Sequence, residues 1–290
     1  LDFDLFKNKM VSGSVDVYKK YTTDLLAIVV RPPGQGCTND FIKNVGATEG
    51  KGIETNLNVK VIDRENFNID LNGNVAYAYT EVTDLGGVSS VLVDESNIPN
   101  GTGYKIGHHA VGYQPYSFLV FEQIYGANGL PIEGAYVDRN KDGVITDSDK
   151  YYRAVRPNWT FGFGLNASYK NFDFTTSFRG QKGGLTYNTK ELVYGNVNHA
   201  APGVVTALNN VLSSDLLFNN NIGNVPTSDY FLEDASFIRC ENITLGYNFE
   251  KNFVKKLGLS GLGVNISVEN PYTFCDIRSV LNYDNSWFAS

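Results

Sequence analysis

Apolar and polar residues alternate with a period of two along most of the chain, which is the pattern of β-strands whose two faces meet different surroundings. The clearest run has apolar residues at every second position, namely Phe161, Phe163, Leu165, Ala167 and Tyr169. After Lys170 and Asn171 the alternation resumes with Phe172, Phe174, Thr176 and Phe178. Two such runs joined by two turn residues predict a β-hairpin whose strands are each about ten residues long.

The same alternation predicts a second long hairpin and several further strands. One strand carries Ile53, Thr55, Leu57, Val59 and Val61, and after a turn at 63–66 the other carries Phe67, Ile69, Leu71, Gly73, Val75, Tyr77 and Tyr79. Further strands are expected at Ser12–Tyr21, Tyr116–Tyr125, Ile238–Phe249 and Gly263–Glu269. No segment has convincing helical periodicity, so the chain is predicted to be all-β and antiparallel.

The predicted connections differ in length. Those near 63–66, 170–171 and 250–260 are short, whereas 84–105, 126–156 and 182–228 are long, polar and rich in Gly and Asn. Short turns on one side and long loops on the other are typical of a transmembrane β-barrel. A soluble β-sandwich also has alternating strands, but the long strands and unequal loops favour the barrel.

A barrel gives each face of a strand its own surroundings. We expect Phe161, Phe163, Leu165, Tyr169, Phe172, Phe174 and Phe178 to face lipid, and Asn166, Ser168, Asp173 and Ser177 to face the lumen. Other strands supply further residues to the polar face: Asn56, Asn58, Lys60, Asp70, Asn72, Asn74, Thr244 and Asn248. No apolar run approaches the roughly 18 residues of a membrane helix, so any crossing of a membrane would use strands.

Composition agrees with many strands joined by turns, because the chain has 18 Tyr, 18 Phe and 29 Gly. The net charge of −7 argues against a nucleic-acid-binding face, which would have to be basic. The cysteines Cys37, Cys240 and Cys275 lack metal-ligand spacing and are interpreted as buried or incidental thiols. Because the sequence starts inside an alternating segment without a signal peptide, we expect it to be a piece of a longer protein.

One polar segment, residues 138–149, has the spacing of a calcium-binding loop and reads DRNKDGVITDSD. The predicted oxygen ligands are the side chains of Asp138, Asn140, Asp142 and Asp149 and the main-chain carbonyl of Val144. Gly143 would allow the sharp turn at the sixth position. No helices flank the segment, so we predict a single structural Ca²⁺ site that stiffens an exposed loop. The alternative is an acidic surface turn that binds no metal.

No catalytic constellation is evident, and we expect no enzyme. The histidines His108, His109 and His199 have neither a partnered nucleophile nor a metal-binding spacing, and polar loop residues are the simpler interpretation. Aromatic residues on loops and strand ends fit either a membrane-interface girdle, which is favoured at strand ends, or ligand binding, for which 182–228 is the better candidate. They are Tyr104, Tyr113, Tyr116, Tyr125, Tyr136, Tyr151, Tyr152, Trp159, Tyr187 and Tyr194.

Several blocks of sequence, in order along the chain, resemble a known family. They are GSVDVYKK at 13–20 with TDLL at 23–26, NVG at 44–46 with KGIE at 51–54, GYQPYSF at 112–118 and GAYVD at 134–138. The most specific are DYFLEDASFIR at 229–239, NITLGY at 242–247 and ENPYTF at 269–274. These blocks resemble the C-terminal half of the SusC/RagA family of TonB-linked outer-membrane transporters.

The resemblance implies that residues 1–274 are the C-terminal part of an incomplete TonB-dependent receptor β-barrel, without its plug domain. Residues 275–290 depart from the family, as in a truncated or frame-shifted tail. The implied function is import of a nutrient oligomer, a glycan or a peptide, across the outer membrane. The implied partners are a SusD-like surface lipoprotein, TonB through the missing N-terminal part, the oligomer and outer-membrane lipid. The alternative is a secreted, soluble, calcium-dependent glycan-binding β-sandwich or adhesin.

Overall fold

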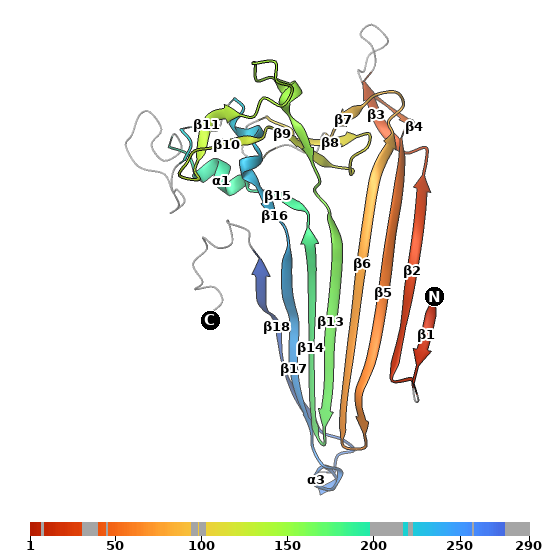
Figure 1. Cartoon of the computed structure of the whole chain (residues 1–290). Coiled ribbons are helices and arrows are strands. Elements are labelled where there is room, and N and C mark those ends of the chain that lie inside the picture. The colour runs from red at the N-terminus through yellow and green to blue at the C-terminus, as the bar shows by residue number, and fades with distance from the viewer. Residues whose placement is uncertain are drawn as a thin grey trace.

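The structure is a computed structural model of the chain, and it describes residues 1–6, 9–30, 40–44, 46–93, 98, 103–197, 217–219, 223–256 and 258–275. Its main feature is an eight-stranded antiparallel sheet, called the wall below (Figure 1). In spatial order the wall contains β1 (Asp2–Leu5), β2 (Val11–Thr22), β5 (Ala47–Arg64), β6 (Phe67–Asp84), β13 (Pro157–Tyr169), β14 (Phe172–Gly183), β17 (Phe237–Asn248) and β18 (Gly263–Cys275).

Among the described helices, none has both the length and the apolar character needed to cross a membrane.

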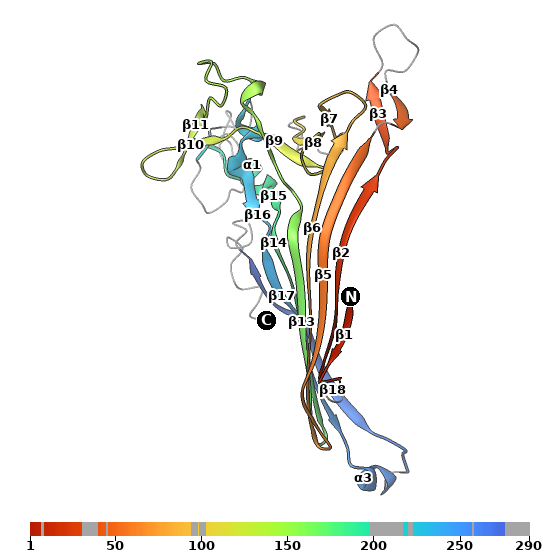
Figure 2. The ribbon, with the colours of Figure 1, turned by 45° about the vertical axis from the view of Figure 1, so that its right-hand side comes forward.

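The connections between wall strands are short at one end and long at the other, as predicted. At the short end, β5 turns into β6 and β13 turns into β14, and the segment between β17 and β18 contains the short helix α3 (Lys251–Lys256). At the other end, long segments form a folded region above the strands (Figure 1). The wall itself is curved, which is visible when it is turned by 45° (Figure 2).

The strand register sorts the side chains of the wall onto two faces. Residues paired across neighbouring strands share a face, so Leu165, opposite Leu71 on β6 and Thr176 on β14, lies on the same face as both. The same face carries Leu5, Val11, Leu57, Val59, Val75, Phe163, Phe178, Ile243, Leu245, Ile266 and Val268. The predicted apolar residues from Phe161 to Phe178 all fall on this face, so the predicted separation of faces is confirmed.

The opposite face is polar over its full width. Asn56 lies opposite Asn74, and Asn58 lies opposite Asn72. Side chains of neighbouring strands are joined there by hydrogen bonds: Asn242 donates to Ser177 (3.0 Å), Asn248 donates to Asp173 (2.6 Å), and Thr244 lies 2.8 Å from Ser267. The wall therefore separates an apolar from a polar environment.

Aromatic side chains bound the apolar face at two levels. Near the long-loop end the Trp159 ring lies 4.9 Å from that of Tyr77, and near the short-turn end the Tyr169 ring lies 5.8 Å from that of Phe67. Trp159 and Tyr169 are ten residues apart on β13, which is about 34 Å along a strand. With a tilt of about 40° this corresponds to about 26 Å along the membrane normal, close to the ~25 Å apolar band of outer-membrane barrels.

The long segments fold into a second region, called the cap below, which comprises the described parts of 84–156 and 184–236. Its first segment contains β7 (Ser90–Leu92), β8 (Gly107–Ala110), β9 (Ser117–Val120), β10 (Gln123–Tyr125), β11 (Pro131–Tyr136), the 3₁₀ helix η2 (Asp147–Asp149) and β12 (Tyr151–Arg153). Its second segment contains β15 (Leu185–Tyr187), α1 (Thr189–Tyr194), the 3₁₀ helices η3 (Val225–Thr227) and η4 (Asp229–Phe231), and β16 (Leu232–Asp234). A separate hairpin, β3 (Leu26–Val30) with β4 (Asp40–Asn44), joins β2 to β5.

One buried core joins the two cap segments. The first segment contributes Ile98, Ile106 and Val120, and the second contributes Leu192, Phe218, Val225, Tyr230 and Phe231. Three of these eight residues are aromatic and contact one another, with the Phe231 ring lying 5.1 Å from that of Tyr230 and 5.4 Å from that of Phe218. The cap is therefore held by its own hydrophobic core, which segments distant in sequence complete.

The predicted strand Tyr116–Tyr125 is wrong. The segment splits into β9 and β10, which belong to different small sheets of the cap. Between them, Phe121 exchanges main-chain hydrogen bonds with the second cap segment, accepting from Asp229 N (2.9 Å) and donating to Thr227 O (2.8 Å). The alternation there reflects packing on the cap core instead of a membrane, because Phe118 and Val120 are the side chains that contact that core.

Three smaller predictions also need correction. The turn at 112–115 does not connect barrel strands, since Gly112 N donates to Val82 O (2.8 Å) at the cap end of β6. A bulge between Lys60 and Ile62 places Ile62 opposite Ile69, so that Val61 has no partner in the β5–β6 register. The chain also contains the six-residue helices α1 and α3, which are too short to produce a recognisable helical period.

Gly180 on β14 offers a test of packing on the apolar face. A Cβ atom there would lie 2.5 Å from the Phe161 ring and 2.8 Å from the Phe237 carbonyl oxygen. We expect Gly180→Val to destabilise the folded barrel by about 1–3 kcal/mol through overpacking. The matched control is Gly73→Val on the same face, where a Cβ would meet only the Gly162 carbonyl at 3.5 Å. Urea unfolding of the assembled protein measures both, and equal losses would refute this account of Phe161 packing.

Candidate metal loop and the polar network behind it

The loop at 138–149 is folded by its own side chains. Asp138 accepts hydrogen bonds from Lys141 N (2.6 Å) and Gly143 N (2.8 Å). Asn140 accepts from Asp142 N (2.9 Å), and Asp142 accepts from Val144 N (2.8 Å). Lys141 (φ 62°) and Gly143 (φ 83°) take left-handed backbone conformations, which let the chain curl around these side chains. The predicted sharp turn at Gly143 is present.

Asp149 closes the loop from its other end. Its carboxylate is fully buried and accepts from Thr146 N (2.8 Å), Arg139 N (3.0 Å) and Asn140 N (3.3 Å). These donors, the Thr146 N–H first among them, lower the pKa of Asp149 below its ordinary value. A lowered pKa means that the carboxylate stabilises the closed loop at neutral pH and that this stabilisation is lost as the pH falls through the lowered pKa.

The predicted ligands can be compared with what calcium requires. All of them offer an oxygen atom as ligand. The side chains of Asp138, Asn140 and Asp142 are fixed by hydrogen bonds from main-chain N–H groups within residues 141–144. The Asp149 carboxylate contacts the same part of the loop, because it accepts a hydrogen bond from Asn140 N. The Val144 side chain is exposed. In the described part of the chain, no three side chains drawn from His, Cys, Asp and Glu form a group that could hold a metal ion. The residues fit calcium by their oxygen atoms and by their order in the loop.

Arg139 connects this loop to the rest of the cap. Its main-chain N–H donates to Asp149, and its guanidinium forms an ion pair with Glu122. The guanidinium also lies over the ring of Tyr151, with its central carbon 4.6 Å from the ring centroid. A conformational change in the loop would therefore be transmitted by the Arg139 side chain to Tyr151 on β12 and to Glu122.

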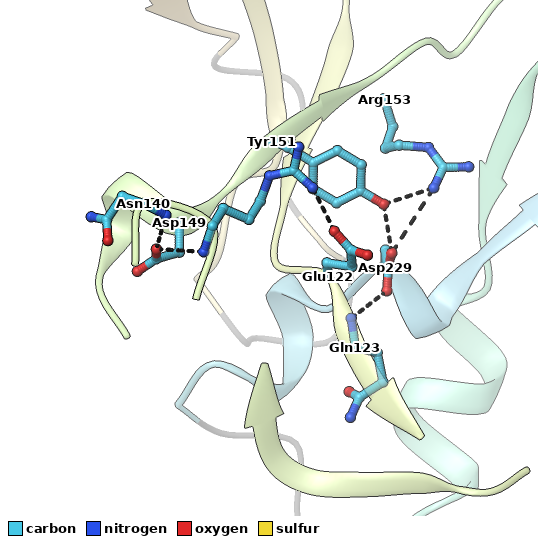
Figure 3. A network of polar contacts seen from close by, with 8 residues as sticks. Glu122, Gln123, Asn140, Asp149, Tyr151, Arg153 and Asp229 are labelled. Atoms are coloured by element: carbon cyan, nitrogen blue, oxygen red, sulfur yellow. Dashed lines mark hydrogen bonds and ion pairs between the residues drawn. The ribbon is translucent and has the colours of Figure 1, made fainter. Parts of the chain in front are cut away.

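Asp229 holds the centre of the network (Figure 3). Its carboxylate accepts from the Tyr151 hydroxyl (2.6 Å) and from Gln123 N (2.9 Å), and Arg153 lies 3.9 Å away. Burial first, and then the hydrogen bond to Asp229, raise the pKa of Tyr151 to about 12. At physiological pH Tyr151 is protonated, as an ordinary tyrosine is, and donates its hydroxyl hydrogen to Asp229.

Gln123 and Ser228 complete the junction between the two cap segments. The buried Gln123 amide donates to the carbonyls of Ile132 (2.8 Å) and Ala135 (3.1 Å) and accepts from the Ser228 hydroxyl (2.9 Å). The sequence interpretation missed Gln123, Tyr151 and Asp229 as a unit. The sequence feature that could have indicated this unit is the block that begins at Asp229, which in the structure runs from the cap into the wall.

The structure also places the other predicted site residues. His108 and His109 lie on β8, half-buried, whereas His199 and Cys37 lie outside the described residues. Cys240 is buried and Cys275 half-buried, and both are free thiols. Of the aromatic residues proposed for the girdle or for a ligand, Trp159 borders the apolar face of the wall. The remaining tyrosines of that set lie in the cap, at or between its elements.

Comparison with known proteins agrees with this architecture. Residues 1–270 match the family described as TonB dependent receptor-like, beta-barrel. The chain is 36% identical to the TonB-dependent receptor SusC of Bacteroides thetaiotaomicron, over 94% of this chain and 28% of that protein. It is 30% identical to a TonB-dependent receptor of Formosa agariphila, over 88% of this chain and 27% of that protein.

Solved structures share the fold. The structure of the RagAB peptide transporter superposes with a TM-score of 0.70 at 23% identity, over 93% of this chain and 30% of that one. The structure of the RagAB peptide importer in the "open-open" state gives a TM-score of 0.70 at 21% identity, over 94% of this chain and 30% of that one.

A two-faced antiparallel wall with aromatic borders and a cap at its long-loop end defines part of an outer-membrane β-barrel. The chain belongs to the TonB-dependent receptor β-barrel family and is of the SusC/RagA type. Its location is accordingly the outer membrane. The alternative of a soluble β-sandwich is wrong, because residues 1–270 match the β-barrel family. The chain spans about three-tenths of the length of the curated relatives it matches.

Proposed function

We propose that this chain forms part of the barrel and of the extracellular cap of an importer for a nutrient oligomer, a glycan or a peptide. The observation that carries the proposal is the two-faced wall, in which Leu165 and its neighbours face lipid and the ladder of Asn56, Asn58, Asn72 and Asn74 faces an aqueous lumen. Amide side chains on that face can hydrogen-bond a polar solute without holding it as strongly as paired charges would. The cap then lies outside the cell, above the lumen.

The proposed partners follow from the class of receptor. The RagAB structures are those of a peptide importer with two components. We propose that a SusD-like surface lipoprotein covers the barrel of the present protein in a similar way. TonB would supply energy through parts of the receptor that lie outside this chain.

Import can be tested in the parent organism. A strain lacking the full-length receptor, and the same strain complemented with it, would be given fluorescently labelled oligosaccharides and oligopeptides. We expect accumulation of one class only in the complemented strain, and its loss when TonB is depleted. Accumulation that is equal in both strains for every oligomer, or that persists without TonB, would contradict the proposal.

We also propose that the loop at 138–149 takes up Ca²⁺ at the cell surface. Asp138, Asn140, Asp142 and Asp149 would supply side-chain oxygens and Val144 its carbonyl. Support comes from the order of the oxygen donors and from the main-chain N–H groups that already hold the three side chains from Asp138 to Asp142. The ion would neutralise three carboxylates and stiffen a loop that Arg139 connects to the rest of the cap. Weak extracellular sites of this type have Kd values of roughly 0.1–1 mM.

Limited proteolysis of the purified receptor tests the calcium loop. With about 2 mM Ca²⁺, in excess of the Kd expected for such sites, we expect cleavage between Gly134 and Arg153 to be at least several-fold slower than with chelator. Asp142→Ala should abolish the difference, because it removes a proposed ligand at an exposed position. The matched control is Asp147→Ala, an exposed carboxylate in the same segment that pairs with Lys150. Equal cleavage in calcium and chelator, with no heat of calcium binding, would leave the segment as a metal-free turn closed by Asp149.

A further inference from the structure

The turn from Gly112 to Tyr116, called the aromatic turn below, is unusually well anchored for an exposed segment. Its start is bonded to the top of β6, because Gly112 N donates to Val82 O (2.8 Å). At its middle the buried Gln114 side chain donates to the side-chain amide oxygen Oδ1 of Asn158 (2.7 Å), at the start of β13. The turn is thus fixed between two long strands of the wall.

Its two tyrosines are exposed in spite of this anchoring. Tyr113 is 45% exposed and Tyr116 is 43% exposed. Tyr116 also has φ 65°, a left-handed conformation that is strained for a bulky side chain. Strain of this kind persists where the surrounding structure enforces it, and it concentrates at ligand-binding positions. The fold therefore holds the Tyr116 ring at the surface at a cost in conformational energy.

Each tyrosine has an aromatic neighbour that limits its freedom. The Tyr113 ring lies 4.4 Å from that of Tyr152, and the Tyr116 ring lies 4.5 Å from that of His109. His109 Nδ1 accepts from Tyr116 N (3.4 Å), so the neutral imidazole carries its proton on Nε2. The rings are consequently positioned before any ligand arrives, which reduces the entropy lost on binding.

One positive charge lies against the aromatic turn, although the whole chain carries −7. The guanidinium of the exposed Arg156 lies 5.6 Å from the centroid of the Tyr116 ring. Burial first, and then Arg156, lower the pKa of His109, and burial, Lys150 and His109 lower that of His108. No carboxylate contributes to either shift. Among the ion pairs of the described residues, none involves Arg156.

We propose that the aromatic turn binds an anionic oligosaccharide, one whose pyranose rings carry carboxylate or sulfate groups; this assignment rests on the import function proposed above. Tyr113 and Tyr116 would stack on the apolar faces of the sugar rings. Arg156 would pair with the acidic group, for which its planar guanidinium is suited. Flat rings held at fixed positions favour a sugar over a flexible acidic peptide, which would use the positive charge alone.

Binding to the purified full-length receptor tests the assignment. The probes are hexagalacturonate, a sulfated galactan hexasaccharide, maltohexaose and a hexaglutamate peptide, compared by calorimetry at one salt concentration. We expect at least one anionic sugar to bind about tenfold or more tightly than both maltohexaose and the peptide, a difference of about 1.4 kcal/mol. Tyr116→Ala and Arg156→Gln should each remove most of that difference. The control is Tyr125→Ala, a tyrosine on β10 that is 50% exposed.

The outcomes separate this proposal from the import function. Tighter binding of the peptide or of maltohexaose, or unchanged binding of the anionic sugars by Tyr116→Ala and Arg156→Gln, would overturn the assignment. In that case, uptake of a neutral or peptide oligomer in the complementation experiment would still support the proposed import function. Conversely, binding of an anionic sugar that depends on Arg156, in a receptor that supports no uptake, would support the aromatic turn and contradict the importer.

Discussion

Leu165→Arg is expected to prevent most of the full-length receptor from assembling in the outer membrane. Leu165 lies on the apolar face of β13, between the aromatic levels of Trp159 and Tyr169, and is opposite Leu71 and Thr176. An arginine placed near the middle of the membrane on the lipid face of a barrel costs about 2–4 kcal/mol. The folded fraction can be measured by the heat-modifiable mobility of the barrel on gels.

Asn166→Arg is the matched control for this substitution. Asn166 is the next residue of the same strand, at the same depth, and points to the polar face between Asp70 and Thr175. An arginine there keeps access to water and gains a nearby carboxylate, so assembly should equal that of the unchanged receptor. If both variants assembled equally well, or if Asn166→Arg were the defective one, the assignment of lipid and lumen faces would be wrong.

The wall could be predicted from sequence because its two environments are uniform along each strand. In the run from Phe161 to Phe178, apolar residues alternate with small or polar ones. The two-residue turn at Lys170 fixes the register of the two strands. The bulge at Val61 interrupts this regularity, and there the prediction failed.

The cap could not be predicted in the same way because its contacts join distant segments. Asp229 binds Tyr151 across 78 residues, and Ser228 binds Gln123 across 105 residues. Its strands are as short as three residues, too few for a period to be recognised. The turn at the start of the loop was easier to predict, since the main-chain hydrogen bonds that Asp138, Asn140 and Asp142 accept span only two to five residues and follow from the order of Asp, Asn and Gly. The closure of the loop by the buried Asp149 was not evident from that order.

Phe231→Ala is expected to loosen the cap and leave the wall assembled. The Phe231 side chain is 1% exposed, and its ring contacts Tyr187, Tyr230 and Phe218 within the core that joins both cap segments. Truncating a buried phenylalanine costs about 3–5 kcal/mol, which is a large share of the stability of a small core. Because Asp229 is two residues away and binds Gln123 and Tyr151, loosening of this core should also release the polar network.

Hydrogen exchange of the purified receptor can locate this loss. Protection should fall in peptides covering 117–125 and 225–234, which supply both halves of the core and network, and should remain in peptides of β13 and β14. The control is Phe253→Ala in α3, at the opposite end of the wall, where the side chain is 48% exposed and the expected cost is within about 0.5 kcal/mol. Uniform loss of protection across wall and cap would show that the cap core is not an independent unit. Unchanged protection in both would show that Phe231 does not hold the two segments together.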